Sequence, residues 1–101
     1  MERSVPPMLA PVAEADPALY AVLTDLHNVA LSEGALDART KVLIALALDA
    51  LAGASQGVKA LTGRARGMGV TDAQIVEALR IVHLVATNGV LAASLPAYTK
   101  A

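Results

Sequence analysis

Apolar residues repeat at spacings of three and four along most of the chain, which is the spacing of helix faces. The first such stretch begins at Asp16-Pro17, where the aspartate can cap the first turn and the proline already has a helical φ angle. The pattern predicts a first helix that ends at Gly34. Its apolar positions are Leu19, Val22, Leu23, Leu26, Val29 and Ala30.

Two further helices are predicted between residues 37 and 67. Asp37 is expected to cap the second helix, which is so apolar that most of its sides must be covered, and Gly53 is expected to end it. Ser55 is expected to cap the third helix, which Gly67 and Gly69 stop. One side of this third helix is predicted to be basic, with Lys59, Arg64 and Arg66.

A fourth, long helix is predicted from Thr71, because Thr71 and Gln74 have the spacing of a capping box. Its apolar residues cover almost the whole circumference, as in a helix at the centre of an assembly. Asn88-Gly89 is predicted to break it, and residues 90–98 to form a short apolar helix weakened by Pro96. No segment alternates as a strand does, so the sequence predicts an all-α fold.

Residues 1–15 are rich in proline and alanine and show no helical or strand period. They are predicted to form an extended N-terminal arm of the kind that can lie on a neighbouring subunit. No linker or internal repeat divides the remainder. Residues 16–101 are therefore predicted to form a single all-helical domain.

The chain is more apolar than a small monomer needs to be. It has 101 residues, of which 55% are hydrophobic, and a mean hydropathy of +0.55. Folding of a chain this short buries only roughly 60–65% of the unfolded surface, so part of the apolar surface is left over. This surplus predicts that the chain associates with copies of itself.

The composition excludes several classes of function. The chain has no cysteine, which rules out disulfides, thiolate catalysis, a cysteine-ligated zinc ion and an iron–sulfur cluster. Its two histidines are far apart in sequence, so no metal site and no cofactor are expected. A net charge of −1 and 2% aromatic residues argue against a nucleic-acid partner.

An uncharged stretch near the C-terminus raises the question of a membrane helix. Residues 81–99 carry no Asp, Glu, Lys or Arg and are long enough to cross a bilayer. Against a membrane helix, Thr87, Asn88 and Ser94 would place polar groups, and Pro96 a helix break, at membrane depth. The N-terminus has no secretory signal pattern, since prolines interrupt it. A soluble cytoplasmic protein is predicted, and a membrane-associated assembly remains the alternative.

Two segments carry a family resemblance. The run LDARTKVLIALA at 36–47, followed by Gly53 and then by GMGVTDAQIVEAL at 67–79, resembles the carboxymuconolactone decarboxylase and alkylhydroperoxidase D-like family. The match spans about residues 35–93. The resemblance implies an alkylhydroperoxidase D-like helical bundle that assembles into homo-trimers or homo-hexamers.

The residues that carry the family's chemistry are missing. Peroxidase-type members have the motif C-x-x-C-x-x-x-H, where this chain has Ala54, Gly57 and Leu61, and a Glu where it has Val42. Decarboxylase-type members lack the cysteines but place Glu and His where this chain has Gly57 and Leu61. The expected function is therefore that of a non-redox homo-oligomer with a small-molecule-binding or a structural role.

Five residues are candidates for a remaining site. Ser55, Gln56 and Lys59 would line the family pocket and bind a small carboxylate or an apolar ligand, or would be a helix cap and two solvated side chains. Asn88 is a further ligand-binding candidate, or only stops its helix. His83 is either a core imidazole or the acid–base group of a cofactor-independent enzyme that decarboxylates or otherwise processes a carboxylic acid or lactone.

Two other polar side chains, Asp49 and His27, have open interpretations. Asp49 could pair with Lys59 or with an arginine of a neighbour, or point to water. His27 is expected at the surface, because it lies beside Asn28 and near Asp25. None of these groups carries a reaction by itself.

Overall fold

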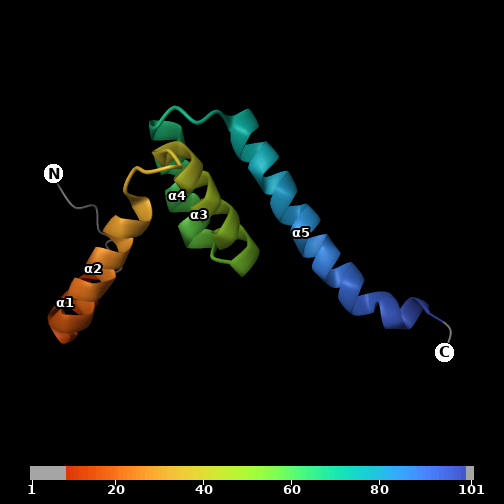
Figure 1. The fold of residues 1–101 in the computed structure, drawn as a ribbon, viewed down its shortest axis with the longest axis horizontal. Helices are drawn as coiled ribbons and strands as arrows, with labels where there is room; N and C mark the ends of the chain where they lie inside the picture. Colours follow the sequence, from red (N-terminus) through yellow and green to blue (C-terminus); the bar gives the residue numbers. More distant parts are fainter. Residues whose placement is uncertain (1–8, 100–101) are drawn as a thin grey trace. The chain divides into compact units, whose positions relative to one another are not determined.

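The structure, a computed structural model, describes residues 9–99 of the chain. These residues form helices and no strand, which confirms the all-α prediction (Figure 1). The helices are α1 (Ala10–Ala15), α2 (Pro17–Leu31), α3 (Ala38–Ala52), α4 (Ser55–Gly67) and α5 (Asp72–Tyr98).

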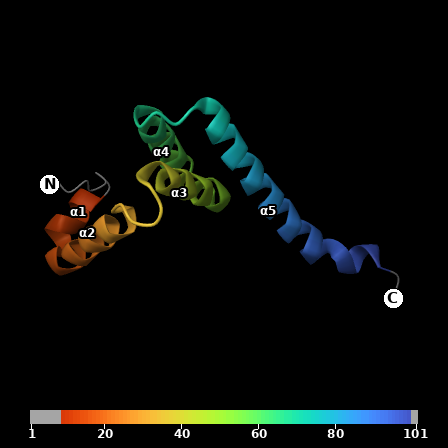
Figure 2. The same cartoon turned by 45° about the horizontal axis from the view of Figure 1, so that its top comes forward.

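The chain divides into two compact units. The first unit is Met1–Ala38 and contains α1 and α2, and the second is Arg39–Ala101 and contains α4, α5 and nearly all of α3. In the first unit α1 packs against α2, and the two helices lie side by side in both views (Figures 1 and 2). The single domain over residues 16–101 stays a prediction.

The extended arm predicted for residues 1–15 is wrong over Ala10–Ala15, which form α1. Pro11 lies in the first turn of this helix, where a missing backbone N–H has no helical partner to lose. The Asp16 N–H donates to the Val12 carbonyl at 2.7 Å and ends the helix. Proline was therefore a helix start here, and not the sign of an extended chain. The first eight residues of the predicted arm lie outside the described residues.

The predicted start of α2 is confirmed, and its predicted end is three residues too late. The Leu19 N–H donates to Asp16 Oδ1 at 3.1 Å, so Asp16 is the N-cap. The helix ends at Leu31 rather than at Gly34. Ser32 is extended, and its hydroxyl donates to the Val29 carbonyl at 3.0 Å. Such side-chain bonds compete with the helical backbone pattern, and this accounts for the earlier end.

The turn between α3 and α4 depends on Gly53, which has a φ angle of 77°. Glycine adopts this left-handed conformation without steric cost and ends α3 as predicted. The Ala54 N–H then donates to the Asp49 carbonyl at 2.8 Å. This bond places Ala54 at the N-cap and Ser55 inside the first turn, so the prediction that Ser55 caps α4 is wrong.

The turn between α4 and α5 follows the sequence prediction. Gly69 has a φ angle of 85°, and the Val70 N–H donates to the Ala65 carbonyl at 3.0 Å. Thr71 and Gln74 form the predicted capping box. The Gln74 N–H donates to Thr71 Oγ1 at 3.1 Å, and the Thr71 N–H donates to Gln74 Oε1 at 2.9 Å.

The break predicted at Asn88-Gly89 is wrong, because α5 continues through it to Tyr98. Glycine costs a helix interior only about 1 kcal/mol relative to alanine, and the residues that follow Gly89 include good helix formers such as Leu91 and Ala92. Pro96 lies in the last turn, where the backbone bonds that it removes are few. Propensity over the whole segment therefore outweighs one local breaking signal.

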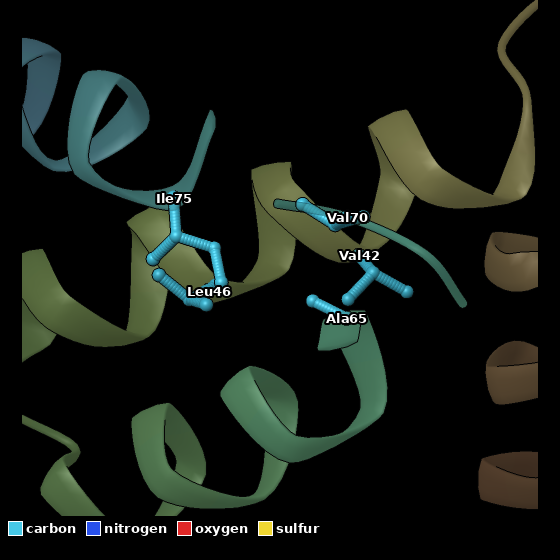
Figure 3. Close-up of a cluster of buried hydrophobic side chains, with 5 residues drawn as sticks. All are labelled: Val42, Leu46, Ala65, Val70 and Ile75. Carbon is cyan, nitrogen blue, oxygen red and sulfur yellow. The ribbon is translucent and has the colours of Figure 1, made fainter. Parts of the chain in front are cut away.

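The core of the second unit is small. Val42 and Leu46 of α3, Ala65 of α4, Val70 of the turn and Ile75 of α5 are its buried hydrophobic residues (Figure 3). Leu46 is 0% exposed and its side chain points toward Ile75 in the close-up. The partly buried side chains packed against this cluster are Leu43, Leu61, Met68 and Leu79.

Much of the remaining apolar surface is exposed in the single chain. Among residues 9–99, sixteen large apolar side chains are at least 44% exposed, against five buried hydrophobic ones. Four lie on α2, three on α3 and eight on α5, and Leu36 precedes α3. The exposed residues are Leu19, Val22, Leu26, Val29, Leu36, Ile44, Leu48, Leu51, Val76, Ile81, Leu84, Val85, Val90, Leu91, Leu95 and Tyr98.

The substitution Leu46→Ala should lower the free energy of unfolding by about 2–5 kcal/mol, because it leaves a cavity at the centre of the core. Leu46→Met, which nearly conserves the volume, should lower it by less than about 1.5 kcal/mol. Urea unfolding followed by circular dichroism measures both. Equal losses for the two variants would show that Leu46 is not the packing centre.

The substitution Thr71→Ala should lower the free energy of unfolding by about 1 kcal/mol, because the Gln74 N–H loses its acceptor. Thr71→Ser keeps the hydroxyl and should retain most of the stability. The same urea titration measures this difference. If the serine variant loses as much as the alanine variant, the hydroxyl is not the source of the stabilisation.

Candidate functional site

A shallow pocket lies where α3 turns into α4. Its lining is Ala50, Gly53, Ala54, Ser55 and Val58, and its volume is about 240 Å³. The left-handed turn at Gly53 folds the chain back, so the end of α3 and the start of α4 form its walls. The lining side chains are small and apolar except for the Ser55 hydroxyl. This volume lies just below the range of roughly 300–1,000 Å³ that is typical of ligand pockets.

Of the predicted site residues, only Ser55 lines this pocket. Gln56 and Lys59 lie on α4 and are exposed. His83 and Asn88 lie on α5, where both are also exposed. The structure brings none of these four to the pocket lining, and their roles stay predictions. Sequence reasoning missed the apolar lining, because alanine and glycine carry no signal of a binding role.

His83 is exposed in the single chain. It does not lie in the core of the chain, whose buried hydrophobic cluster belongs to α3, α4 and the first turns around Ile75. An apolar helix was expected to bury its histidine. In the single chain, however, only 6% of the most apolar stretch of α5 is buried, so the imidazole is open to solvent.

Polar atoms are buried on one face of α2. Thr24 is 7% exposed, and Thr24 Oγ1, His27 Nε2 and Asn28 Nδ2 are buried without a hydrogen-bond partner. Positions 24, 27 and 28 share a helix face. The prediction that His27 lies at the surface is therefore wrong, since His27 is half-buried. In the single chain α2 covers polar groups while its apolar residues face solvent.

Asp49 is half-buried next to the pocket, where α3 approaches α4. Its carboxylate occupies the space that a Cβ atom on Gly57 would fill. Glycine at position 57 therefore permits the close approach of the carboxylate to the α4 backbone. Asp49 forms no ion pair with Lys59 within the described residues. An ion pair between exposed side chains joins Arg66 Nε and Asp72 Oδ1 at 2.9 Å.

The four positions that would carry redox or proton-transfer groups lie at the pocket and in the core. Ala54 lines the pocket, and Gly57 lies against Asp49. Val42 is 1% exposed, and Leu61 packs against the core. None of the four has an ionisable side chain. Within residues 9–99, no group of three or more His, Cys, Asp or Glu side chains could hold a metal ion.

These features define a class of protein: over the described residues it is all-helical, with a pocket at the α3–α4 turn, a small core and an excess of exposed apolar side chains. The chain belongs to the carboxymuconolactone decarboxylase family, whose model matches residues 17–100. The resemblance seen in the sequence is confirmed, and the match extends beyond residues 35–93 to include α2. No curated protein and no solved structure matches the chain.

Within the part of the chain that the structure describes, α5 alone is long and apolar enough to cross a membrane. Length and composition are weak grounds for such an assignment, because core helices of soluble proteins pass the same test. Members of the family are generally soluble. The apolar length of α5 is therefore consistent with a soluble protein.

The contact between Asp49 and Gly57 is tested by a double-mutant cycle. Gly57→Ala should gain up to about 1 kcal/mol of stability in an Asp49→Ala background, because alanine favours helix more than glycine does. With Asp49 present the gain should shrink or vanish, since the new Cβ displaces the carboxylate. Urea unfolding of the four proteins measures the coupling.

The matched control for this cycle is Gly63→Ala, because nothing lies within 4 Å of a Cβ at that position. Its effect should be the same in both backgrounds. A Gly57→Ala gain that does not depend on residue 49 would contradict the contact.

Proposed function

We propose that this protein is a non-redox homo-oligomer that binds a small molecule in the pocket at the α3–α4 turn. The single observation that carries the proposal is that Val42, Ala54, Gly57 and Leu61 stand where the family resemblance implies reactive groups, while a pocket remains at Ala54. Without a thiol, no peroxide-reducing cycle can run on these positions. If the pocket binds no ligand, the same oligomer has a purely structural role.

The pocket chemistry favours an apolar ligand over a carboxylate. Its walls include the methyl groups of Ala50, Ala54 and Val58, with one hydroxyl from Ser55. The carboxylate of Asp49, which precedes Ala50 of the lining in the sequence, would repel an anion. A small, mostly apolar molecule with one hydrogen-bonding group therefore fits best, and a small carboxylate would need Lys59 to approach it.

The exposed apolar side chains support self-association. A stable interface buries about 800 Å² on each partner and uses about 20–30 residues of each. Sixteen large exposed apolar side chains exceed what a monomer of this size normally leaves in water. The family resemblance favours a trimer or a hexamer as the assembly. We place this assembly in the cytoplasm, with neither a membrane nor a nucleic acid as partner.

A cofactor-independent enzyme that uses His83 on a carboxylic acid or lactone is the second candidate. The exposed imidazole is chemically suited to acid–base catalysis. It ranks second because His83 is not among the residues that line the pocket. Under this alternative, His83→Ala abolishes turnover and leaves the assembly intact.

Native mass spectrometry of the purified protein tests the proposal. We expect a trimer or hexamer that carries a reproducible extra mass, which disappears in a denaturing spectrum of the same sample. A clean oligomer without extra mass supports the structural form. A monomer at all concentrations overturns the proposal, and turnover in a peroxide-reduction assay overturns its non-redox part.

A further inference from the structure

Charge is segregated along the chain. Residues 4–38 contain no Lys or Arg, and Glu2 and Arg3 cancel, so residues 1–38 carry a net charge of −5. Residues 39–101 carry seven basic and three acidic residues, a net charge of +4. The boundary between the two signs coincides with the boundary between the two compact units. The acids of the first unit that fall within the described residues are Glu14, Asp16, Asp25, Glu33 and Asp37.

The first unit also presents an apolar stripe. Leu19, Val22, Leu26 and Val29 of α2 are 45–73% exposed. Their spacing of three, four and three is that of the contact positions in paired helices. The opposite face of α2 buries Thr24. A surface helix of a monomer has the reverse arrangement, so the stripe is suited to contact with another helix.

The second unit offers a surface that matches this stripe in charge. Helix α4 contains Lys59, Arg64 and Arg66 and no acidic residue. All three basic side chains are exposed. Between them lie Ala60 and Gly63, both exposed, and the space above Gly63 is open. Large apolar side chains can therefore approach α4 closely, with basic side chains on either side.

We propose that α2 of one copy docks on α4 of a second copy. The apolar stripe of α2 covers Ala60 and Gly63, and the acidic surface of the first unit faces the basic side chains of α4. Docking of α2 on another α2 is disfavoured, because it would bring two units of charge −5 together. This inference rests on the homo-oligomer proposed above and names its interface.

The proposed contact joins two different surfaces. It can be made twice in a two-fold pair, where α2 of each copy docks on α4 of the other, or once between successive neighbours around a closed ring.

A steric variant of α4 provides the first test. Gly63→Leu should favour the helix, because leucine has the higher helix propensity, yet it fills the space that the stripe occupies. We expect at least a tenfold higher dissociation constant in sedimentation equilibrium, with unchanged circular dichroism. Gly63→Ala is the matched control and should retain the assembly. Wild-type assembly of the leucine variant would overturn the proposal.

Charge reversal provides the second test. E14K/E33K in the first unit and K59E/R64E in α4 should each raise the dissociation constant at least tenfold at about 50 mM salt. All four substitutions in one chain should restore assembly, because the charges are again complementary. R39E/R80E changes the charge of the second unit equally but lies off α4, and should have a smaller effect. Failure of the four-fold variant to regain assembly would overturn the proposal.

The outcomes distinguish this inference from the proposed function. If the wild-type protein is a monomer at every concentration, both fail. If Gly63→Leu and the charge variants remain oligomeric with unchanged dissociation constants, the interface lies elsewhere and only this inference fails.

Discussion

The packing of Leu46 against Val42, Ala65 and Ile75 is the interaction on which the second unit depends. It joins α3, α4 and the first turn of α5, and it is the place where those three helices share fully buried apolar atoms. The cluster has no aromatic residue. Its burial is therefore modest, since an aromatic side chain alone would contribute 150–250 Å². A core of this size leaves most of α5 without a covering layer, and this is the physical reason to expect partner subunits.

The same packing involves positions at which the sequence resemblance implies ionisable groups in other family members. Val42 and Leu61 are apolar here and contribute to the core or pack against it. Near the pocket, the carboxylate of Asp49 occupies the space that a Cβ atom on residue 57 would need, and Gly57 has none. Each replacement removes a reactive group and adds either apolar packing or a close approach of α3 to α4. A chain whose value to the cell is its assembly or its pocket tolerates such replacements, whereas a peroxidase does not.

Local signals predicted most of the fold, and two of the errors share one cause. Asp16, Gly53 and the Thr71–Gln74 capping box were identified correctly, because each acts through backbone groups within a few residues. Pro11 and Gly89 were each taken as breaks, although a proline in a first turn and a glycine among good helix formers are both tolerated. The pocket could not be predicted beyond Ser55. Its lining depends on how the turn at Gly53 apposes two helices, which residue types alone do not reveal.

The arrangement of α2 links the fold to the proposed assembly. Burying Thr24 Oγ1, His27 Nε2 and Asn28 Nδ2 without partners costs about 1–3 kcal/mol for each group, while the apolar stripe of the same helix gains nothing from exposure to water. In a single chain both faces of α2 are therefore energetically unfavourable, since one buries polar groups without partners and the other exposes apolar side chains to water. An assembly that covers the stripe removes the unfavourable exposure on one of these two faces. It also brings the negatively charged first unit of one copy against the positively charged second unit of another. The proposed assembly of identical subunits therefore accounts together for the apolar excess, the segregated charge and the exposed apolar stripe of α2.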